Sequence, residues 1–155
     1  MNSDKKAARY QRVYKQLCEL LVKCDNPNSR IATIAAVLHH KMDNFFWTGF
    51  YLLMDNKLLV GPYQGPVACM DLKKDQGVCW AGINNKQTIC VADVEKFPGH
   101  ISCDTRSRSE IVVPLWNNKK EIIGVLDIDS KELNNFDIID TENLERILNL
   151  VFKTL

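Results

Sequence analysis

The sequence lacks several features that define other classes of protein. Lysine and arginine number 20 and aspartate and glutamate number 19, so the formal net charge is only +1. A charge this close to zero gives no strong field for a polyanion or an anionic membrane, and we therefore expect neither nucleic acid nor membrane as a partner. No apolar run approaches the roughly 20 residues that span a bilayer, and the N-terminus has no apolar stretch typical of a secretion signal. These absences predict a cytoplasmic protein.

Motifs for bound cofactors are also missing. The sequence contains no Gly-rich phosphate loop, no dinucleotide fingerprint and no Ser/His/Asp nucleophile elbow, so we expect no cofactor. It has six cysteines but no CxxC pair, and Cys69, Cys79, Cys90 and Cys103 follow one another at separations of ten, eleven and thirteen residues. Zinc sites usually contain at least one tight Cys or His pair. Metal ligation is therefore a minor interpretation, and we expect no metal.

The composition that remains is that of one ordinary folded domain. The chain has 155 residues, of which 46% are hydrophobic and 25% are charged. This length supports one continuous core rather than two, and no repeat or Gly/Ser linker divides the sequence. We expect a single domain over residues 1–155.

Hydrophobic periodicity predicts a run of strands with helices on either side. Expected helices span residues 12–24, 31–38, 78–84 and 137–155, the last with Asp137 as its N-cap; expected strands span 45–53, 58–63, 67–72, 88–91 and both arms of a hairpin over 110–130, and an irregular loop spans 92–109. Because helices do not alternate with the strands, the fold class is α+β, with a central, mostly antiparallel sheet flanked by helices.

The hairpin over residues 110–130 has two apolar arms around a polar turn. A turn that is symmetric about residues 118–119 places Glu110 opposite Asp127. The same register pairs Val112 with Val125 and Leu115 with Ile122.

Three carboxylates are expected on one face of this hairpin. Strand alternation places Asp127 and Asp129 on the face opposite Leu126 and Ile128, beside Glu110. Neighbouring carboxylates raise the pKa of at least one member, which suits that group to donate a proton or to hold a cationic amine. The alternative is an exposed acidic edge without a function.

The cysteines divide by their surroundings. Cys18 and Cys24 lie on a helical stripe and Cys90 lies inside an expected strand, so we expect all three to be buried and inert. Cys103 lies instead in a Pro-Gly-His loop near Arg106, where positive charge favours the reactive thiolate. His100 is a candidate base in that loop, with a surface hydrogen-bonding role as the alternative.

Aromatic residues mark a candidate pocket wall. Trp47 and Tyr51 share one face of the strand over 45–53, with Gly49 between them. Such positions are usually core, but an aromatic wall also suits a thioether or sulfoxide methyl group.

Several segments together resemble the free methionine-(R)-sulfoxide reductase family, which has a GAF fold. They are WTGFYLL, LVGPYQGPVAC, QGVCWAG, VADVEKFPGHISCDTRSRSEIVVPL and IIGVLDIDS. The similarity runs from about Ile31 to the last helix. It implies an enzyme that reduces free methionine-(R)-sulfoxide to methionine, with electrons from thioredoxin, and it leaves a homodimer open.

The resemblance also implies roles for particular residues. Three redox cysteines of the family match Cys69, Cys79 and Cys103. The thiolate of Cys103 would attack the sulfoxide sulfur while a protonated Glu110 or Asp127 assists departure of the oxygen. Cys69 would then form a disulfide with Cys103, with Cys79 as an alternative or relay thiol.

The same resemblance assigns the substrate pocket. It implies that Glu110, Asp127 and Asp129 bind the substrate ammonium and that Trp47 and Tyr51 surround its methyl group and side chain. Such a pocket would admit the free amino acid and exclude peptide-bound methionine sulfoxide.

Two positions depart from the family pattern. Trp80 stands where a glycine usually follows the GVC cysteine, and it is expected to crowd the segment that carries Cys79. Arg106 stands where a small residue is common, and it would either alter access to Cys103 or lower the pKa of its thiol.

Two functions from other classes compete with the enzyme. One is a noncatalytic GAF module that binds a small ligand, and the other is a cysteine-based redox sensor without a small substrate. The acidic residues separate the redox sensor from the enzyme, because a redox sensor without a small substrate has no use for them.

Overall fold

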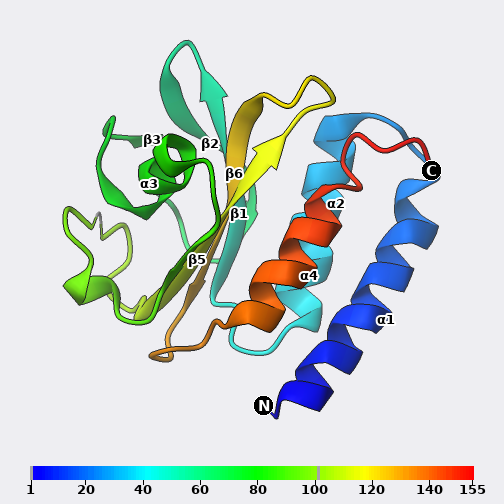
Figure 1. The fold of residues 1–155 in the computed structure, drawn as a ribbon. Coiled ribbons are helices and arrows are strands. Elements are labelled where there is room, and N and C mark those ends of the chain that lie inside the picture. The colour runs from blue at the N-terminus through cyan, green and yellow to red at the C-terminus, as the bar shows by residue number, and fades with distance from the viewer. Residues whose placement is uncertain (1, 101) are drawn as a thin grey trace.

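One sheet of six strands forms the centre of the computed structural model, which describes residues 2–100 and 102–155. The strand order is β3-β2-β1-β6-β5-β4, and all neighbouring strands are antiparallel. The elements, in chain order, are α1 (Ser3–Leu21), α2 (Pro27–Lys41), β1 (Trp47–Met54), β2 (Lys57–Gln64), β3 (Asp71–Leu72), α3 (Gly77–Asn85), β4 (Ile89–Val91), a 3-10 turn (Val94–Lys96), β5 (Ser109–Trp116), β6 (Ile122–Ser130) and α4 (Ile138–Leu148) (Figure 1). The predicted α+β architecture is confirmed.

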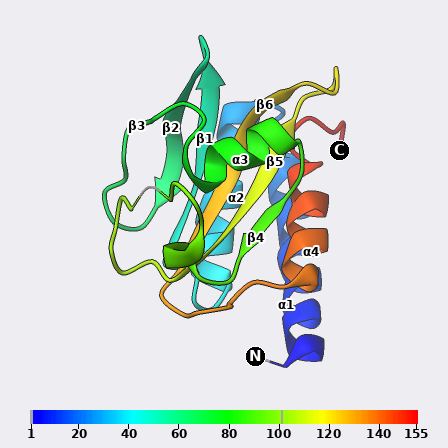
Figure 2. The ribbon, with the colours of Figure 1, turned by 60° about the vertical axis from the view of Figure 1, so that its left-hand side comes forward.

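The two faces of the sheet have different covers. Helices α1, α2 and α4 lie together on one face, and α3 lies with the long loops on the other (Figures 1 and 2). Alternation along the strands divides the core accordingly, since Leu126 and Ile128 pack toward the three helices whereas Val112 and Val125 pack toward α3. The α3 side also receives the acidic side chains of β5 and β6.

Several helix ends differ from the prediction, and α2 covers Pro27–Lys41 rather than 31–38. Helix α1 covers Ser3–Leu21 rather than 12–24, because the Asn2 side chain caps it by accepting hydrogen bonds from the amides of Asp4 and Lys5. Asp137 caps α4 as predicted, and Asp140 completes a capping box. This helix ends at Leu148, not at residue 155, because the chain then turns and offers its carbonyl groups to a buried arginine.

The predicted register of the hairpin is wrong by two residues. Glu110 pairs with Asp129 rather than Asp127, Val112 pairs with Asp127 rather than Val125, and Leu115 pairs with Gly124 rather than Ile122. The turn and a bulge together cause this shift. The Asn117 side chain accepts hydrogen bonds from the amides of Lys119 and Glu121, so that Trp116 pairs with Ile122, and an irregularity between Leu115 and Trp116 adds the second residue. A shift of two residues preserves the face of every side chain, so the three carboxylates still lie together.

Three smaller predictions also need correction. The strand expected over 67–72 contains only Asp71 and Leu72, and the loop expected over 92–109 includes a 3-10 turn. Cys24 is exposed because α1 ends before it, Cys90 is exposed on the edge strand β4, and Cys18 is half-buried. No helix of the described residues is long and apolar enough to cross a membrane.

Arg30 joins the ends of the helical layer. Its side chain is only 4% exposed, and it donates hydrogen bonds to the carbonyl groups of Cys24, Leu150, Val151 and Lys153. These carbonyls follow the C-terminal ends of α1 and α4, where the partial negative charge of a helix favours a cation. The guanidinium therefore holds both helix ends in place.

We predict that Arg30→Met lowers the free energy of unfolding by about 3 kcal/mol, because several buried carbonyl groups lose their donor. Denaturant unfolding followed by circular dichroism measures this difference. The matched control is Arg12→Met, since Arg12 is exposed and its side chain forms no hydrogen bond or ion pair with another described residue. This variant should change stability by less than about 0.5 kcal/mol. Equal unfolding midpoints for the two variants would contradict the assignment.

Candidate functional site

A small cavity on the α3 side of the sheet brings most of the predicted site residues together. Its lining includes Trp47, Tyr51, Cys103, Glu110, Asp127 and Asp129. A second cavity shares Tyr51, Glu110 and Asp127 and adds Cys79. Among the predicted residues only Cys69 lines neither cavity, and it is bonded to Cys103, which does.

The carboxylates form the floor of the site. Glu110 projects from β5, and Asp127 and Asp129 project from β6, with Glu110 and Asp127 only 5% and 6% exposed. Burial raises the pKa of all three carboxyl groups, and the negative charge of their neighbours raises it further. Oδ1 of Asp127 is fully buried and has no hydrogen-bond partner among the described residues. The site therefore favours a cation or a proton.

The aromatic wall is a stack of three rings. The Trp47 ring lies 5.7 Å from that of Tyr51 and 5.2 Å from that of Tyr63, measured between centroids. Gly49 makes this stack possible, because a Cβ atom there would lie 2.3 Å from Cβ of Tyr63 and 2.6 Å from the Trp47 ring. Tyr63 was not predicted, since its contribution depends on how β2 pairs with β1.

The same aromatic residues hold the loop that carries Cys69. The Trp47 indole donates a hydrogen bond to the carbonyl of Pro66 at 3.1 Å, and the Tyr51 hydroxyl donates one to the carbonyl of Cys69 at 2.9 Å. Cys69 and Cys103 form a disulfide with their Cα atoms 5.6 Å apart. This is the pairing that the resemblance implied.

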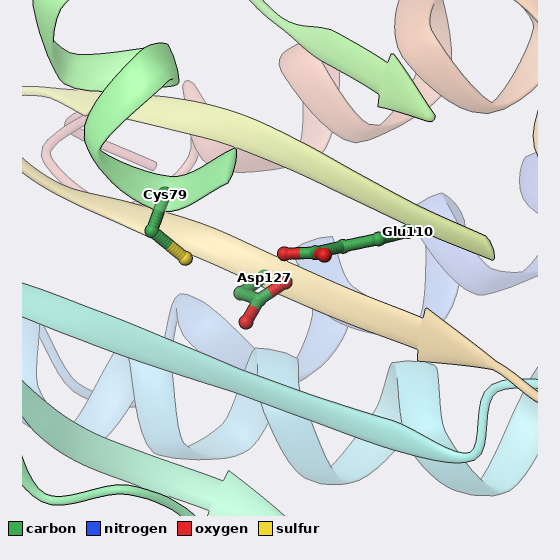
Figure 3. A group of neighbouring side chains, drawn as sticks. All are labelled: Cys79, Glu110 and Asp127. Carbon is green, nitrogen blue, oxygen red and sulfur yellow. The ribbon is translucent and has the colours of Figure 1, made fainter. Parts of the chain in front are cut away.

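Cys79 lies apart from that disulfide at the inner end of the site. It is on the first turn of α3, is 4% exposed, and its Sγ atom lies within 4.8 Å of carboxylate oxygens of Glu110 and Asp127 (Figure 3). Burial raises the pKa of its thiol, and the charge of Asp127 adds to this effect. The adjacent Trp80 is buried and donates a hydrogen bond to the carbonyl of Leu72, so it fixes α3 against β3.

Two polar residues of the long loop have partners that the sequence did not identify. His100 has the acidic partner that the sequence did not identify, since its Nε2 atom lies 3.5 Å from Oε2 of Glu110. Burial lowers the pKa of His100. Arg106 forms a bidentate ion pair with Asp104 and lowers the pKa of that carboxyl to about 2. Its guanidinium also lies 4.8 Å from the centre of the Phe46 ring. Arg106 is therefore held by Asp104 and Phe46 at the edge of the cavity.

The chain is similar to known proteins of the GAF class. The sequence pattern of the GAF domain matches residues 10–152. GAF domain-containing protein A of Dictyostelium discoideum is 43% identical over 152 residues, which cover 97% of this chain and 95% of that protein. The free methionine-R-sulfoxide reductase of Escherichia coli is 41% identical over 125 residues, covering 81% of this chain and 75% of that enzyme.

A solved structure extends the similarity to the whole fold. The free methionine-R-sulfoxide reductase of Neisseria meningitidis, determined in complex with its substrate, superposes with a TM-score of 0.91 at 38% identity and covers 99% of this chain and 92% of that one.

Proposed function

The chain belongs to the free methionine-R-sulfoxide reductase family of GAF domains, and we propose that it reduces free methionine-(R)-sulfoxide to methionine by a thiol and disulfide cycle. The observation that carries this function is the position of the Cys69–Cys103 disulfide: Cys103 lines the same cavity as the buried carboxylates and the aromatic wall. A redox-active sulfur, a proton source and an apolar wall are thus within one small site.

The first step transfers oxygen to the protein. In the reduced protein the Cys103 thiolate attacks the sulfoxide sulfur, and a protonated carboxyl of Glu110 or Asp127 gives its proton to the departing oxygen. Water then attacks the Cys103 sulfur of the sulfonium adduct, breaks its bond to the substrate sulfur and loses a proton. The products are methionine and a sulfenic acid on Cys103, so the sulfoxide is reduced and the thiolate is oxidised. The buried position of both carboxyl groups supports this role, because burial favours their protonated forms.

The next steps restore the thiols. The Cys69 thiol attacks the sulfenic acid, a disulfide forms and water leaves. A thioredoxin dithiol then exchanges with this disulfide and is itself oxidised. We assign the resolving role to Cys69 because it is the partner of Cys103. Cys79 is less suited to it, since its thiol is buried and has a raised pKa, so a relay role for Cys79 stays a prediction.

Substrate recognition follows from the same surroundings. The ammonium group of the free amino acid supplies the positive charge that Glu110, Asp127 and Asp129 lack, whereas a peptide-bound residue has no such group. Trp47 and Tyr51 suit the methyl group and the sulfur, which pack well against aromatic faces. This arrangement favours the enzyme over a redox sensor without a substrate.

The reductant is expected to reach the disulfide from the surface. Cys103 is exposed, and Val67 and Met70, which flank Cys69 in the chain, are 84% and 76% exposed. Apolar side chains around an accessible disulfide suit contact with a protein dithiol such as thioredoxin. Because the cycle requires reduced thiols, we also propose a cytoplasmic location. A homodimer stays a prediction from the family resemblance.

The stereochemistry of the substrate tests the assignment. With a thioredoxin recycling system, the protein should consume the (R) epimer of free methionine sulfoxide and leave the (S) epimer and peptide-bound sulfoxide largely untouched. Chromatographic measurement of methionine release distinguishes these cases. Equal turnover of both epimers would contradict the assignment.

The two cysteine roles make different predictions for a single turnover. Cys103→Ser should release no methionine, whereas Cys69→Ser should still yield about one methionine per protein and then fail to recycle through thioredoxin, because the resolving thiol acts only after oxygen transfer. Quench-flow measurement of methionine gives the yield. If Cys69→Ser loses the single turnover and Cys103→Ser keeps it, the roles must be exchanged.

Substitution of the carboxylates should reduce activity without unfolding the protein. Glu110→Gln and Asp127→Asn nearly preserve volume and remove the acid, so activity should fall about 10²–10⁴-fold. Asp129→Asn should mainly raise KM, because the residue is expected to hold the ammonium group. Measurement of kcat, KM and Tm separates these effects.

Their matched controls are Leu126→Ala and Ile128→Ala on the opposite face of β6, where both side chains are fully buried. These variants should lose roughly 2–5 kcal/mol of stability without a specific kinetic signature. Full activity of both Glu110→Gln and Asp127→Asn would show that the proposed acid is wrong.

The surface around Cys69 gives a prediction about the reductant. Met70→Ser should raise KM for thioredoxin several-fold while turnover with a small dithiol is unchanged, because only the protein reductant contacts this side chain. Met54→Ser is the control, since Met54 is also exposed but lies at the far end of β1. An unchanged KM for thioredoxin in Met70→Ser would place the contact elsewhere.

A further inference from the structure

The inner end of the site holds a sulfur atom together with two carboxylates. Sγ of Cys79 and carboxylate oxygens of Glu110 and Asp127 all lie within 4.8 Å of one another. They come from three elements, α3, β5 and β6, and in Figure 3 the three side chains converge on one point. The cycle proposed above uses Glu110 and Asp127 but does not require Cys79, so it does not explain why a thiol lies beside these two carboxylates.

A second observation points to a positively charged ligand at this place. Asp127 is 94% buried, given its exposure of 6%, and its Oδ1 atom has no hydrogen-bond partner among the described residues. Buried carboxylate oxygens are normally hydrogen-bonded, paired with a charge or bound to a metal. The unpartnered oxygen belongs to the same carboxyl group that faces Cys79 and Glu110.

We propose that Cys79, Glu110 and Asp127 bind a thiophilic divalent cation of the Zn²⁺ and Cd²⁺ class. Thiolate and carboxylate are both zinc ligands, and three protein ligands leave a fourth position for water. Mg²⁺ and Ca²⁺ prefer oxygen ligands alone, so the sulfur selects against them. His100 lies 3.5 Å from Glu110, the position from which an outer partner orients a ligating carboxylate.

The cation would inhibit the enzyme. It occupies the two carboxylates that are assigned to the substrate ammonium, so metal and substrate exclude each other; this consequence rests on the proposed function. Binding forms bonds from the metal to the Cys79 sulfur and to the carboxylate oxygens. It releases the thiol proton and the proton held by the two carboxyl groups, with no change in oxidation state. Because neither Cys69 nor Cys103 is a ligand, the site exists while their disulfide is intact.

Metal binding to the oxidised, full-length protein tests the site directly. Titration with Cd²⁺ should produce the ultraviolet thiolate-to-cadmium band at one equivalent, and Zn²⁺ should abolish that band by displacement. Cys79→Ser should lose the band, and Asp127→Asn and Glu110→Gln should each weaken binding at least tenfold. Cys24→Ser and Cys90→Ser are the controls, since both cysteines are exposed and lie outside the cluster, and they should bind as the wild type does.

Several outcomes would overturn the proposal. They are the absence of a stoichiometric band in the wild type, its retention in Cys79→Ser, or its loss in Cys90→Ser. If Cys79→Ser does not fold, the Asp127→Asn and Glu110→Gln titrations decide, because unchanged affinity in both would exclude these ligands.

Competition separates the metal site from the proposed activity. Free methionine-(R)-sulfoxide should displace Cd²⁺ from the oxidised wild type, and a band that persists at saturating sulfoxide would overturn the inhibition. Sulfoxide reduction by a chain that binds no metal would overturn the metal site alone. Metal binding by a chain that reduces no sulfoxide would overturn the proposed function alone.

Discussion

Three carboxylates, from Glu110, Asp127 and Asp129, lie together on one face of the sheet, where burial and mutual repulsion both oppose their charged forms. Glu110 and Asp129 are direct neighbours across the hairpin, an arrangement that costs stability in an ordinary sheet. The cost persists because the cavity beside them can receive a proton or a cation. The chemistry of the site follows from this one unfavourable contact.

The opposite face of β5 and β6 packs in the hydrophobic core, and this packing offsets the cost of the buried carboxylates. Leu126 and Ile128 alternate with the acidic residues of β6 and pack, fully buried, under α1, α2 and α4. Apolar burial of this kind is the main favourable contribution to folding. Arg30 adds hydrogen bonds that fix the helical layer at the ends of α1 and α4. The helical side of the sheet thus provides stability that offsets the electrostatic cost of the acidic site on the other side.

Hydrogen bonds connect the aromatic wall to the loop that carries Cys69. Trp47 and Tyr51 come from β1, the neighbour of β6, and both donate hydrogen bonds to carbonyl groups of the loop that carries Cys69. The side chains that would contact the substrate therefore also position the cysteine that bonds to Cys103. This connection places the disulfide next to the carboxylates although its two cysteines are 34 residues apart.

The sequence by itself determined the α+β architecture, the short helix that carries Cys79, and the common face of Glu110, Asp127 and Asp129. These features depend on local periodicity, and strand alternation preserves a face even when the register shifts by two residues. Only the three-dimensional structure decided the pairing of Glu110 with Asp129, because the hydrogen bonds of the Asn117 side chain and a bulge between Leu115 and Trp116 together set the register. The sequence also could not predict the contacts of His100 with Glu110 and of Cys79 with Asp127. Each contact joins segments that meet only when α3 and the long loop pack on the sheet.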